Sequence, residues 1–448
     1  MKKLLVLDIV GLSKKQLDNI KPPNILQIFE NGFQTVMMPT FPAVTCSVQA
    51  SITSGYTPAE HGIISNGFYD HNSKQVFFWE QSSNLVTKPR IWDILKKANP
   101  NLKTAVLFWQ NSLFINSDIV ITPKPIHQDN GIVMWCYSKP VNYYENIAED
   151  IGDFDLQWYW GPLVSIKSSL WILEATKYTI KNHSPNLLLV YLPHLDYAAQ
   201  KNGPESEEFK KALLELDTII GDIFSFLSSY KNDEYEIMII SEYSFNNVKN
   251  SISPNKILRE EGLLSIRNIS GKEYVDFEYS KAFAMVDHQI AHIFTKPEFE
   301  NQIENIFNHQ SEISEILNKD SQKELKINNP KSGNLILCSK EDSWFNYYWW
   351  DDSNKAPEFT FNVDIHRKPG YDPLELFFDP QTKKISQNTS LIKGSHGLIN
   401  KNQVDELPVF GMTLKQNELK DPINAVQIAP TISKFFNINT NLPGKSII

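Results

Sequence analysis

The fold of this chain is limited most by a series of short, continuously apolar segments that alternate with amphipathic helical patterns. Apolar runs without polar alternation are typical of strands buried on both faces of a parallel sheet. Five such strands are predicted, at residues 4–10, 103–109, 118–122, 186–192 and 235–241. Helices are predicted at residues 13–20, 24–32, 207–230 and 424–436. This order predicts an α/β fold in which helices cover both faces of a largely parallel sheet.

Composition narrows the class of protein. The chain has 448 residues, 41% of them hydrophobic, which is enough for a large core. It carries 52 acidic and 43 basic residues, a formal net charge of -9, and this excess of negative charge disfavours general binding to nucleic-acid polymers. The three cysteines have no CxxC spacing, so neither a disulfide framework nor a cysteine zinc site is expected.

The N-terminal segment begins with two lysines, as a signal peptide does, but its apolar run is short and is interrupted by Asp8. No stretch approaches the ~20 apolar residues that a membrane-spanning helix needs. We therefore expect a cytoplasmic protein that does not bind membranes.

The texture of the sequence changes in its second half. Residues 251–365 are rich in Asn, Lys, Glu and Ser and include an aromatic cluster at 344–350. We interpret them as an inserted α+β cap that selects the substrate, and residues 1–250 and 366–448 as the core. The aromatic cluster is interpreted as packing rather than as a platform for a nucleobase.

Carboxylates follow three of the predicted strands. Asp8 ends the first strand, Asp196 follows the fourth, and Glu242 follows the fifth. Functional residues gather at the carboxyl ends of parallel strands, so we expect these side chains to share one site. His194, two residues before Asp196 in what we take to be an extended segment, is expected to face the same site.

The segment 39–70, PTFPAVTCSVQASITSGYTPAEHGIISNGFYD, contains the predicted nucleophile. Thr45 lies where a helical pattern begins, and a hydroxyl there is close to exposed backbone N–H groups and the positive end of the helix dipole. This position suits attack on phosphorus, although a hydroxyl needs activation, most simply by a metal ion. A plain helix cap is the alternative role for Thr45.

This segment resembles the nucleotide pyrophosphatase/phosphodiesterase family of the alkaline phosphatase superfamily. The pieces PAVT, GYTPAEHGI and NGFYD match family motifs in order and spacing. Further matches are KPRIW at 88–92, LFWQNS at 107–112, DYAAQKNGP at 196–204 and GSHG at 394–397. The resemblance implies an alkaline-phosphatase-like α/β/α sandwich with a mostly parallel central sheet and an inserted α+β cap.

The resemblance also implies a site with two divalent metal ions, with zinc as the expected metal and manganese or magnesium as alternatives. Asp8 and Thr45 would belong to one metal, and Asp196 and His396 to the other. Asn66 would donate a hydrogen bond to a phosphate oxygen. A neutral amide suits a diester with one negative charge better than a monoester with two.

Two histidines of the family pattern are replaced here, by Gln200 and Tyr243, and the carboxylate before Tyr243 is Glu242. Loss of imidazole shifts the preference from zinc toward ions that favour oxygen ligands. Glu242 can still bind a metal through oxygen, and His194 is the replacement ligand that we favour. His366, and the pair His288 and His292, are weaker candidates, because apolar neighbours indicate that the pair lies in a buried strand.

We therefore predict a metal-dependent hydrolase of phosphodiester, nucleotide pyrophosphate or related phosphonate bonds, with Thr45 as nucleophile and a small phosphorylated substrate. Two alternatives stay open. One is a related superfamily reaction, such as phosphonoacetate hydrolysis or a phosphoglycerate mutase-like transfer. The other is an inactive relative that binds a phosphorylated metabolite or partner.

Overall fold

A computed structural model describes residues 1–129, 131–230, 234–400, 402–415, 419 and 422–448. Its centre is a nine-stranded sheet in the order β23-β2-β22-β11-β1-β10-β5-β6-β9. In that order the strands span Ile423–Asn424, Phe33–Met38, Val409–Met412, Glu236–Ile240, Leu4–Ile9, Leu187–Leu192, Thr104–Leu107, Ile119–Pro123 and Cys136–Lys139. The five neighbours from β11 to β6 run parallel, whereas β22 and β9 flank them in the antiparallel direction. All five predicted strands and the mostly parallel sheet are confirmed.

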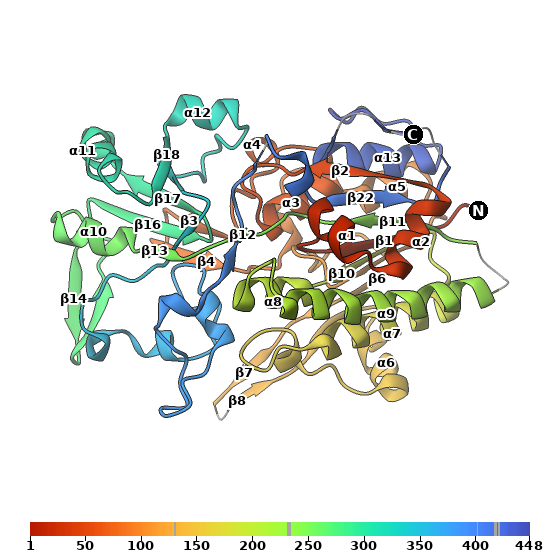
Figure 1. Cartoon of the computed structure of the whole chain (residues 1–448), viewed down its shortest axis with the longest axis horizontal. Coiled ribbons are helices and arrows are strands. Elements are labelled where there is room, and N and C mark those ends of the chain that lie inside the picture. Colours follow the sequence, from red (N-terminus) through yellow and green to blue (C-terminus); the bar gives the residue numbers. More distant parts are fainter. Residues whose placement is uncertain (130, 231–233, 401, 416–418, 420–421) are drawn as a thin grey trace.

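Helices cover both faces of this sheet, as predicted (Figure 1). On one face α9 packs against α2, α7 and α8, and on the other α13 packs against α3 and α5. The helices span Lys14–Ile20 (α1), Pro23–Asn31 (α2), Thr45–Ser54 (α3), Pro58–His61 (α4), Ile91–Ala98 (α5), Tyr143–Ile151 (α6), Ile166–His183 (α7), His194–Asn202 (α8), Glu207–Ser229 (α9) and Ile428–Phe435 (α13). Strands β1 and β10 are buried along their whole length because they are covered on both sides.

A second layered unit lies at the other end of the molecule from the two termini (Figure 1). Its centre is a four-stranded antiparallel sheet in the order β16-β17-β19-β18. These strands span Ala282–Asp287, Ile290–Thr295, Leu335–Ser339 and Ile313–Leu317, and the surrounding helices α10, α11 and α12 span Pro254–Glu260, Pro297–Asn308 and Lys319–Glu324. Smaller strands are β3 (Gly67–Asp70), β4 (Gln75–Phe78), β7 (Ile126–Gln128), β8 (Gly131–Val133), β12 (Asn246–Asn247), β13 (Asn250–Ile252), β14 (Ile266–Ile269), β15 (Lys272–Val275), β20 (Ser343–Phe345) and β21 (Gly394–Ser395).

Two large hydrophobic clusters correspond to these two units. The cap cluster also takes in side chains from outside the predicted insert, such as Phe41, Phe78, Tyr371 and Ile392. The predicted aromatic cluster at 344–350 is buried in it. Segments before and after residues 251–365 therefore pack into the hydrophobic cluster of the second unit and connect that unit, the predicted cap, to the core.

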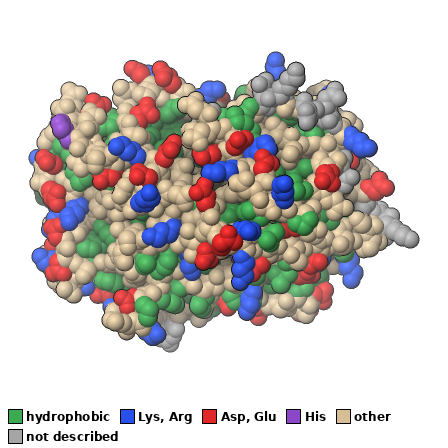
Figure 2. All heavy atoms as spheres, viewed as in Figure 1, with side chains coloured by type: hydrophobic (Ala, Val, Ile, Leu, Met, Phe, Trp, Pro, Cys, Tyr) green, Lys and Arg blue, Asp and Glu red, His purple; other side chains and the backbone are tan. Residues whose placement is uncertain are grey.

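No helix within the described ranges is both long enough and apolar enough to cross a membrane. On the face shown in Figure 2, acidic and basic side chains are interspersed over both units.

Candidate active site

Three carboxylates lie together where parallel strands end. Asp8 is the second-last residue of β1, and Glu242 follows β11. Asp196 follows β10 and lies in the first turn of α8. Because β11, β1 and β10 are neighbours in the sheet, their carboxyl ends bring these side chains to one edge. All three are buried, Asp8 and Glu242 completely.

Asp8 and Glu242 form a buried carboxyl pair. Burial raises the pKa of both groups, and the negative charge of Asp8 raises that of Glu242 further. Gln49 donates to Oε1 of Glu242, but Oε2 of Glu242 and both oxygens of Asp8 have no hydrogen-bond partner among the described residues. Two buried carboxyls this close need a shared proton or a cation between them.

Thr45 is the first residue of α3, a helix buried along its whole length. Its Oγ1 lies 2.9 Å from the hydroxyl oxygen of Tyr243. The helix continues with polar side chains that fix neighbouring segments, for example Gln49, which accepts from the backbone N–H of Gln110 at 2.7 Å. The predicted nucleophile is therefore held in place by a rigid, fully packed helix.

Tyr243 connects Thr45 to the second carboxylate. Its hydroxyl donates to Oδ1 of Asp196 at 3.2 Å, and Nε2 of Gln200 donates to Oδ2 of Asp196 at 2.6 Å. Tyr371 in turn donates to Oε1 of Gln200 at 2.7 Å. Burial raises the pKa of Asp196 to about 6, and the charge of His288 and these hydrogen bonds oppose that rise.

Four rings form a column beside this network. Tyr371, His288, His396 and Tyr243 lie with successive ring centroids 3.7 Å apart. His396 Nδ1 lies 2.8 Å from the Ala43 carbonyl oxygen, so Nδ1 carries the proton and Nε2 is left as an acceptor, 3.9 Å from Oδ1 of Asp196. Burial, and the charge of His288, lower the pKa of His396 well below its usual range.

His288 belongs to this site, although the sequence led us to place it in a buried strand. It occupies the turn between β16 and β17 with a φ of 59°, and its Nδ1 lies 2.6 Å from Oδ1 of Asp287. Only His292 lies within a strand, where Nε2 is 3.3 Å from the Ile64 carbonyl, so the pair does not share a face. The signal missed was the polar triplet at 287–289 between two apolar runs, which indicates a hairpin turn.

Asn66 is tied to the same aspartate. Its side-chain amide donates to Oδ1 of Asp287 at 3.1 Å, and its Oδ1 accepts from the backbone N–H of Cys46 at 2.9 Å. An amide carries two N–H groups, so a bond to a phosphate oxygen would not require the loss of this contact. Asn66 lines a small separate cavity together with Cys46 and Phe68.

His194 is not brought to the site. The predicted extended segment is the first turn of α8, where residues two positions apart do not face each other. The imidazole of His194 turns toward α9, with Nε2 3.5 Å from Oε2 of Glu215, while Asp196 faces the pocket. The argument from strand alternation was therefore wrong at this position.

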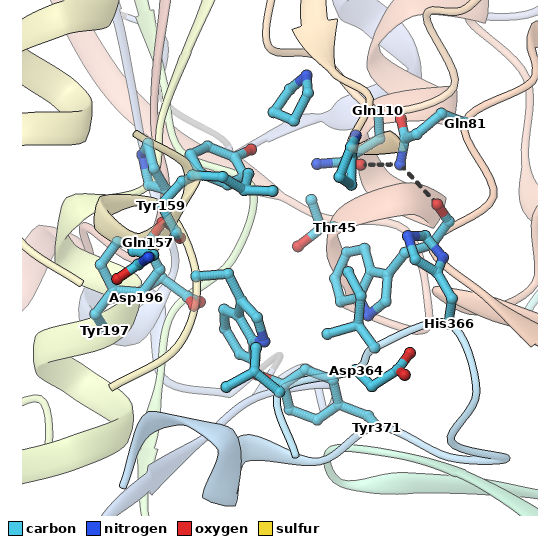
Figure 3. A pocket seen from close by; sticks show the side chains of 18 of the residues that line it. Thr45, Gln81, Gln110, Gln157, Tyr159, Asp196, Tyr197, Asp364, His366 and Tyr371 are labelled. Atoms are coloured by element: carbon cyan, nitrogen blue, oxygen red, sulfur yellow. Dashed lines mark hydrogen bonds between the residues drawn. The ribbon is translucent and has the colours of Figure 1, made fainter. Parts of the chain in front are cut away.

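A pocket of about 460 Å³ opens above these groups. Its inner end is lined by Thr45, Asp196, Tyr243, His288 and His396. Figure 3 shows Thr45 in the middle, with Gln81 and Gln110 on one side, Tyr159, Asp196 and Tyr197 on the other, and Asp364, His366 and Tyr371 from the segment after the cap. His366 thus lines the pocket, with Nδ1 3.3 Å from the Phe78 carbonyl oxygen.

This geometry can be set beside known proteins. Residues 4–372 match the type I phosphodiesterase / nucleotide pyrophosphatase family. The chain belongs to this family. The predicted resemblance is thereby confirmed.

Curated relatives of this phosphodiesterase family match parts of the chain. An uncharacterized pyrophosphatase/phosphodiesterase of Schizosaccharomyces pombe is 26% identical over 243 residues, which are 54% of this chain and 44% of that relative. The bovine bis(5'-adenosyl)-triphosphatase ENPP4 is 22% identical over 232 residues, 49% of this chain and 42% of that relative. The match thus spans less than half the length of either relative.

Solved structures agree over the whole fold. Murine ectonucleotide pyrophosphatase/phosphodiesterase 5, in an inactive form bound to AMP, aligns with a TM-score of 0.64 at 14% identity and covers 100% of this chain and 97% of its own. Phosphonoacetate hydrolase of Sinorhizobium meliloti 1021, bound to phosphonoformate, aligns with a TM-score of 0.62 at 13% identity, covering 97% and 94%. The predicted fold is confirmed by these structures.

Phosphodiesterases of this family generally depend on divalent metal ions. Within the described ranges no group of three or more His, Cys, Asp or Glu side chains is arranged to hold a metal ion. The unpartnered oxygens of Asp8 and Glu242 fit one cation. Both oxygens of Asp196 already accept hydrogen bonds, from Tyr243 and Gln200, so Asp196 has less need of a second cation than Asp8 and Glu242 have of the first.

Proposed function

We propose that this chain hydrolyses phosphodiester, pyrophosphate or related phosphonate bonds with Thr45 as nucleophile. The observation that carries the proposal is the chain of hydrogen bonds from Thr45 through Tyr243 to Asp196 at the buried end of the pocket. It gives the hydroxyl a route for its proton. The relatives support the same chemistry, since their names describe a pyrophosphatase/phosphodiesterase and a bis(5'-adenosyl)-triphosphatase.

In the first step, Oγ1 of Thr45 attacks phosphorus and the bond to the leaving alcohol breaks. The Thr45 proton passes to the Tyr243 oxygen as the Tyr243 proton passes to Asp196, which acts as the general base. The leaving alkoxide takes up the proton that Asp196 received, so Asp196 is ionised again for the second step. Water then attacks the phosphothreonine, restores the Thr45 hydroxyl and releases a phosphate monoester.

Asp8 and Glu242, with the Thr45 hydroxyl, would hold one divalent cation. Such an ion supplies Lewis acidity, lowering the pKa of a bound hydroxyl and offsetting negative charge on phosphate. A ligand set of oxygens alone suits magnesium or manganese better than zinc. We therefore propose one magnesium or manganese ion in place of the two zinc ions that the resemblance implies.

A diester is favoured over a monoester. Among the described residues no Lys or Arg lines the pocket, so the second negative charge of a monoester would meet no guanidinium or ammonium group. We propose that Asn66, which directly precedes β3 and accepts from the backbone N–H of Cys46 near the start of α3, contributes a neutral donor to the phosphate.

The test compares bis(4-nitrophenyl) phosphate with 4-nitrophenyl phosphate, with magnesium or manganese added. We expect turnover of the diester, and a quenched reaction in which mass spectrometry locates a phosphoester on Thr45. The Thr45→Ser variant should keep the adduct, now on serine. Faster turnover of the monoester, or turnover with no adduct on residue 45, would contradict the proposal.

One observation favours an inactive binding protein. The donors on Asp196 occupy positions where the family pattern has imidazoles. If the chain only binds, phosphodiesters should shift its melting temperature equally in the Thr45→Ala variant and the unmodified chain, with turnover in neither.

A further inference from the structure

The outer part of the pocket differs chemically from its inner end. Three segments form it: residues 122–125 with 132–134 from the β7–β8 region, residues 156–163, and residues 363–378. The outer side chains are mainly apolar, and four of them are strongly exposed: Ile132 at 45%, Leu163 at 55%, Val363 at 39% and Phe378 at 49%. We call these four the apolar rim. The inner end is the reverse, because Thr45, Asp196, Tyr243 and His396 are polar and buried.

Exposed apolar side chains are concentrated at this rim. Fourteen large apolar side chains are strongly exposed within the described ranges, and six of them lie on the three rim segments or directly next to them. They are Ile126, Ile132, Val133, Leu163, Val363 and Phe378. Single exposed apolar residues are ordinary, but a contiguous group around a pocket marks a binding surface for an apolar group.

The charges that line the pocket disfavour polyanionic leaving groups. No Lys or Arg of the described chain lines the pocket, and its carboxylates are Asp196 and Asp364. The Asp364 side chain is occupied by an ion pair with the exposed Arg367. A polyanionic leaving group, such as a nucleoside polyphosphate, would therefore bring several negative charges to a surface without a cationic partner.

We propose that the apolar rim binds a hydrocarbon chain on one ester of the substrate, so that the substrate is an amphiphilic phosphodiester. This inference rests on the proposed function, because it places the phosphate at Thr45. The polar inner end receives the singly charged diester, and the rim removes the chain from water. The β7–β8 hairpin pairs only with itself among the described strands and extends beyond the main sheet, which allows it to cover such a chain (Figure 1).

The main test uses alkyl 4-nitrophenyl phosphates with methyl, butyl, hexyl and octyl chains, all kept monomeric in solution. We expect kcat/KM to rise by up to about fourfold for each added methylene, the gain that burial of one methylene gives. Ile132→Asp should flatten this dependence of kcat/KM on the length of the hydrocarbon chain. Val404→Asp is the matched control, because Val404 is exposed to a similar extent, 47%, and does not line the pocket.

A binding measurement separates this inference from the proposed function. The Thr45→Ala variant is titrated with methyl, butyl and octyl methyl phosphates by calorimetry, and affinity should rise with chain length, with a negative heat-capacity change. If affinity rose with the length of the hydrocarbon chain but the unmodified protein hydrolysed none of the esters, the apolar rim would be supported and the proposed hydrolase activity would be contradicted. If all esters were hydrolysed at one rate and their affinity did not depend on hydrocarbon-chain length, the inference about the apolar rim would be wrong and the proposed hydrolase activity would be supported.

Two further experiments distinguish a free amphiphile from a lipid in a membrane, and test whether a nucleoside or a second copy of the chain occupies the apolar rim instead. Chain-dependent turnover of monomeric esters supports a free amphiphile, whereas turnover of a long-chain phosphodiester only in phosphatidylcholine vesicles supports the same rim used at a lipid surface. A thymidine 4-nitrophenyl phosphate turned over faster than the octyl ester would overturn the inference. So would dimerisation in sedimentation that Ile132→Asp abolishes while chain length has no effect.

Discussion

The two halves of the candidate site use similar residues but differ in how their oxygens are satisfied. In the first half, Asp8 and Glu242 are fully buried, and three of their carboxyl oxygens have no hydrogen-bond partner in the part of the chain that the structure describes. In the second half, both oxygens of Asp196 accept hydrogen bonds, from Tyr243 and Gln200. Unpaired buried oxygens are costly unless a cation or proton compensates them, whereas satisfied oxygens have no such need.

The difference separates two jobs that two metal ions would share. In the mechanism that we propose, the first half concentrates positive charge and the second conducts a proton from Thr45 to Asp196. Each of the following experiments acts on one half and leaves the other as its control.

The largest effect is expected where the two halves meet. Thr45→Ala removes the nucleophile, and kcat/KM for bis(4-nitrophenyl) phosphate should fall at least about a thousandfold. Thr45→Ser keeps a hydroxyl at the same position and should retain most of the activity. Equal activity in the alanine and unmodified chains would show that another group attacks phosphorus.

The next effect belongs to the first half. Asp8→Asn removes one of the two charges that would hold the cation, so kcat/KM should fall at least about a hundredfold. Equilibrium dialysis followed by elemental mass spectrometry should show about one manganese ion per unmodified chain and none per variant. Asp196→Asn is the matched control, since it should lose activity and keep the ion. If only the Asp196→Asn variant lost the ion, the cation would lie in the second half of the site, and our placement of it at Asp8 and Glu242 would be wrong.

The second half is tested by Tyr243→Phe, which deletes only the hydroxyl between Thr45 and Asp196. Interrupting the proton path should lower kcat/KM by about ten- to a hundredfold, while the bound cation stays. Tyr371→Phe removes a hydroxyl one step farther out, on Gln200, and should cost much less. If both variants lost the same activity, the path through Tyr243 would be wrong.

The pH dependence should report the same half. Asp196 must be ionised to act as a base, and burial raises its pKa to about 6. The rate constant kcat/KM should therefore be level above about pH 6 and fall tenfold per pH unit below it. Gln200→Leu removes a hydrogen bond that favours the ionised form, so it should move this limb to higher pH. Asp364→Asn, in the pocket but outside the path, should leave the limb in place.

Much of the fold, and the strand-end carboxylates, could be predicted from the sequence. Buried parallel strands are unusually apolar, and their ends meet at one edge whatever the loops do, so Asp8, Asp196 and Glu242 could be placed together. The prediction for His194 failed for a local reason. The chain passes from the end of β10 at Leu192 to the start of α8 at His194, and the His194 side chain therefore turns toward Glu215.

His288 and Tyr371 could not be found in this way. They reach the site through the docking of the cap and the segment after it, which pack against the core from distant positions in the sequence. Helical or strand periodicity reports which face of an element is buried but not which partner covers it. Their place in the site is visible only in the folded chain, where the His288 ring lies against His396 and Tyr371 stacks on His288 and donates to Gln200.

The smallest expected change, a single added ion, tests the comparison itself. The double variant Gln200→His and Tyr243→His replaces the two donors on Asp196 with imidazoles, which prefer zinc. Bound metal, measured with zinc in the dialysis buffer, should rise from about one to two ions per chain. The double variant Gln200→Leu and Tyr243→Phe removes the same donors without adding ligands and should stay at one. Two ions in the unmodified chain would mean that zinc displaces the donors from Asp196, and the difference between the halves would then vanish whenever metal is bound.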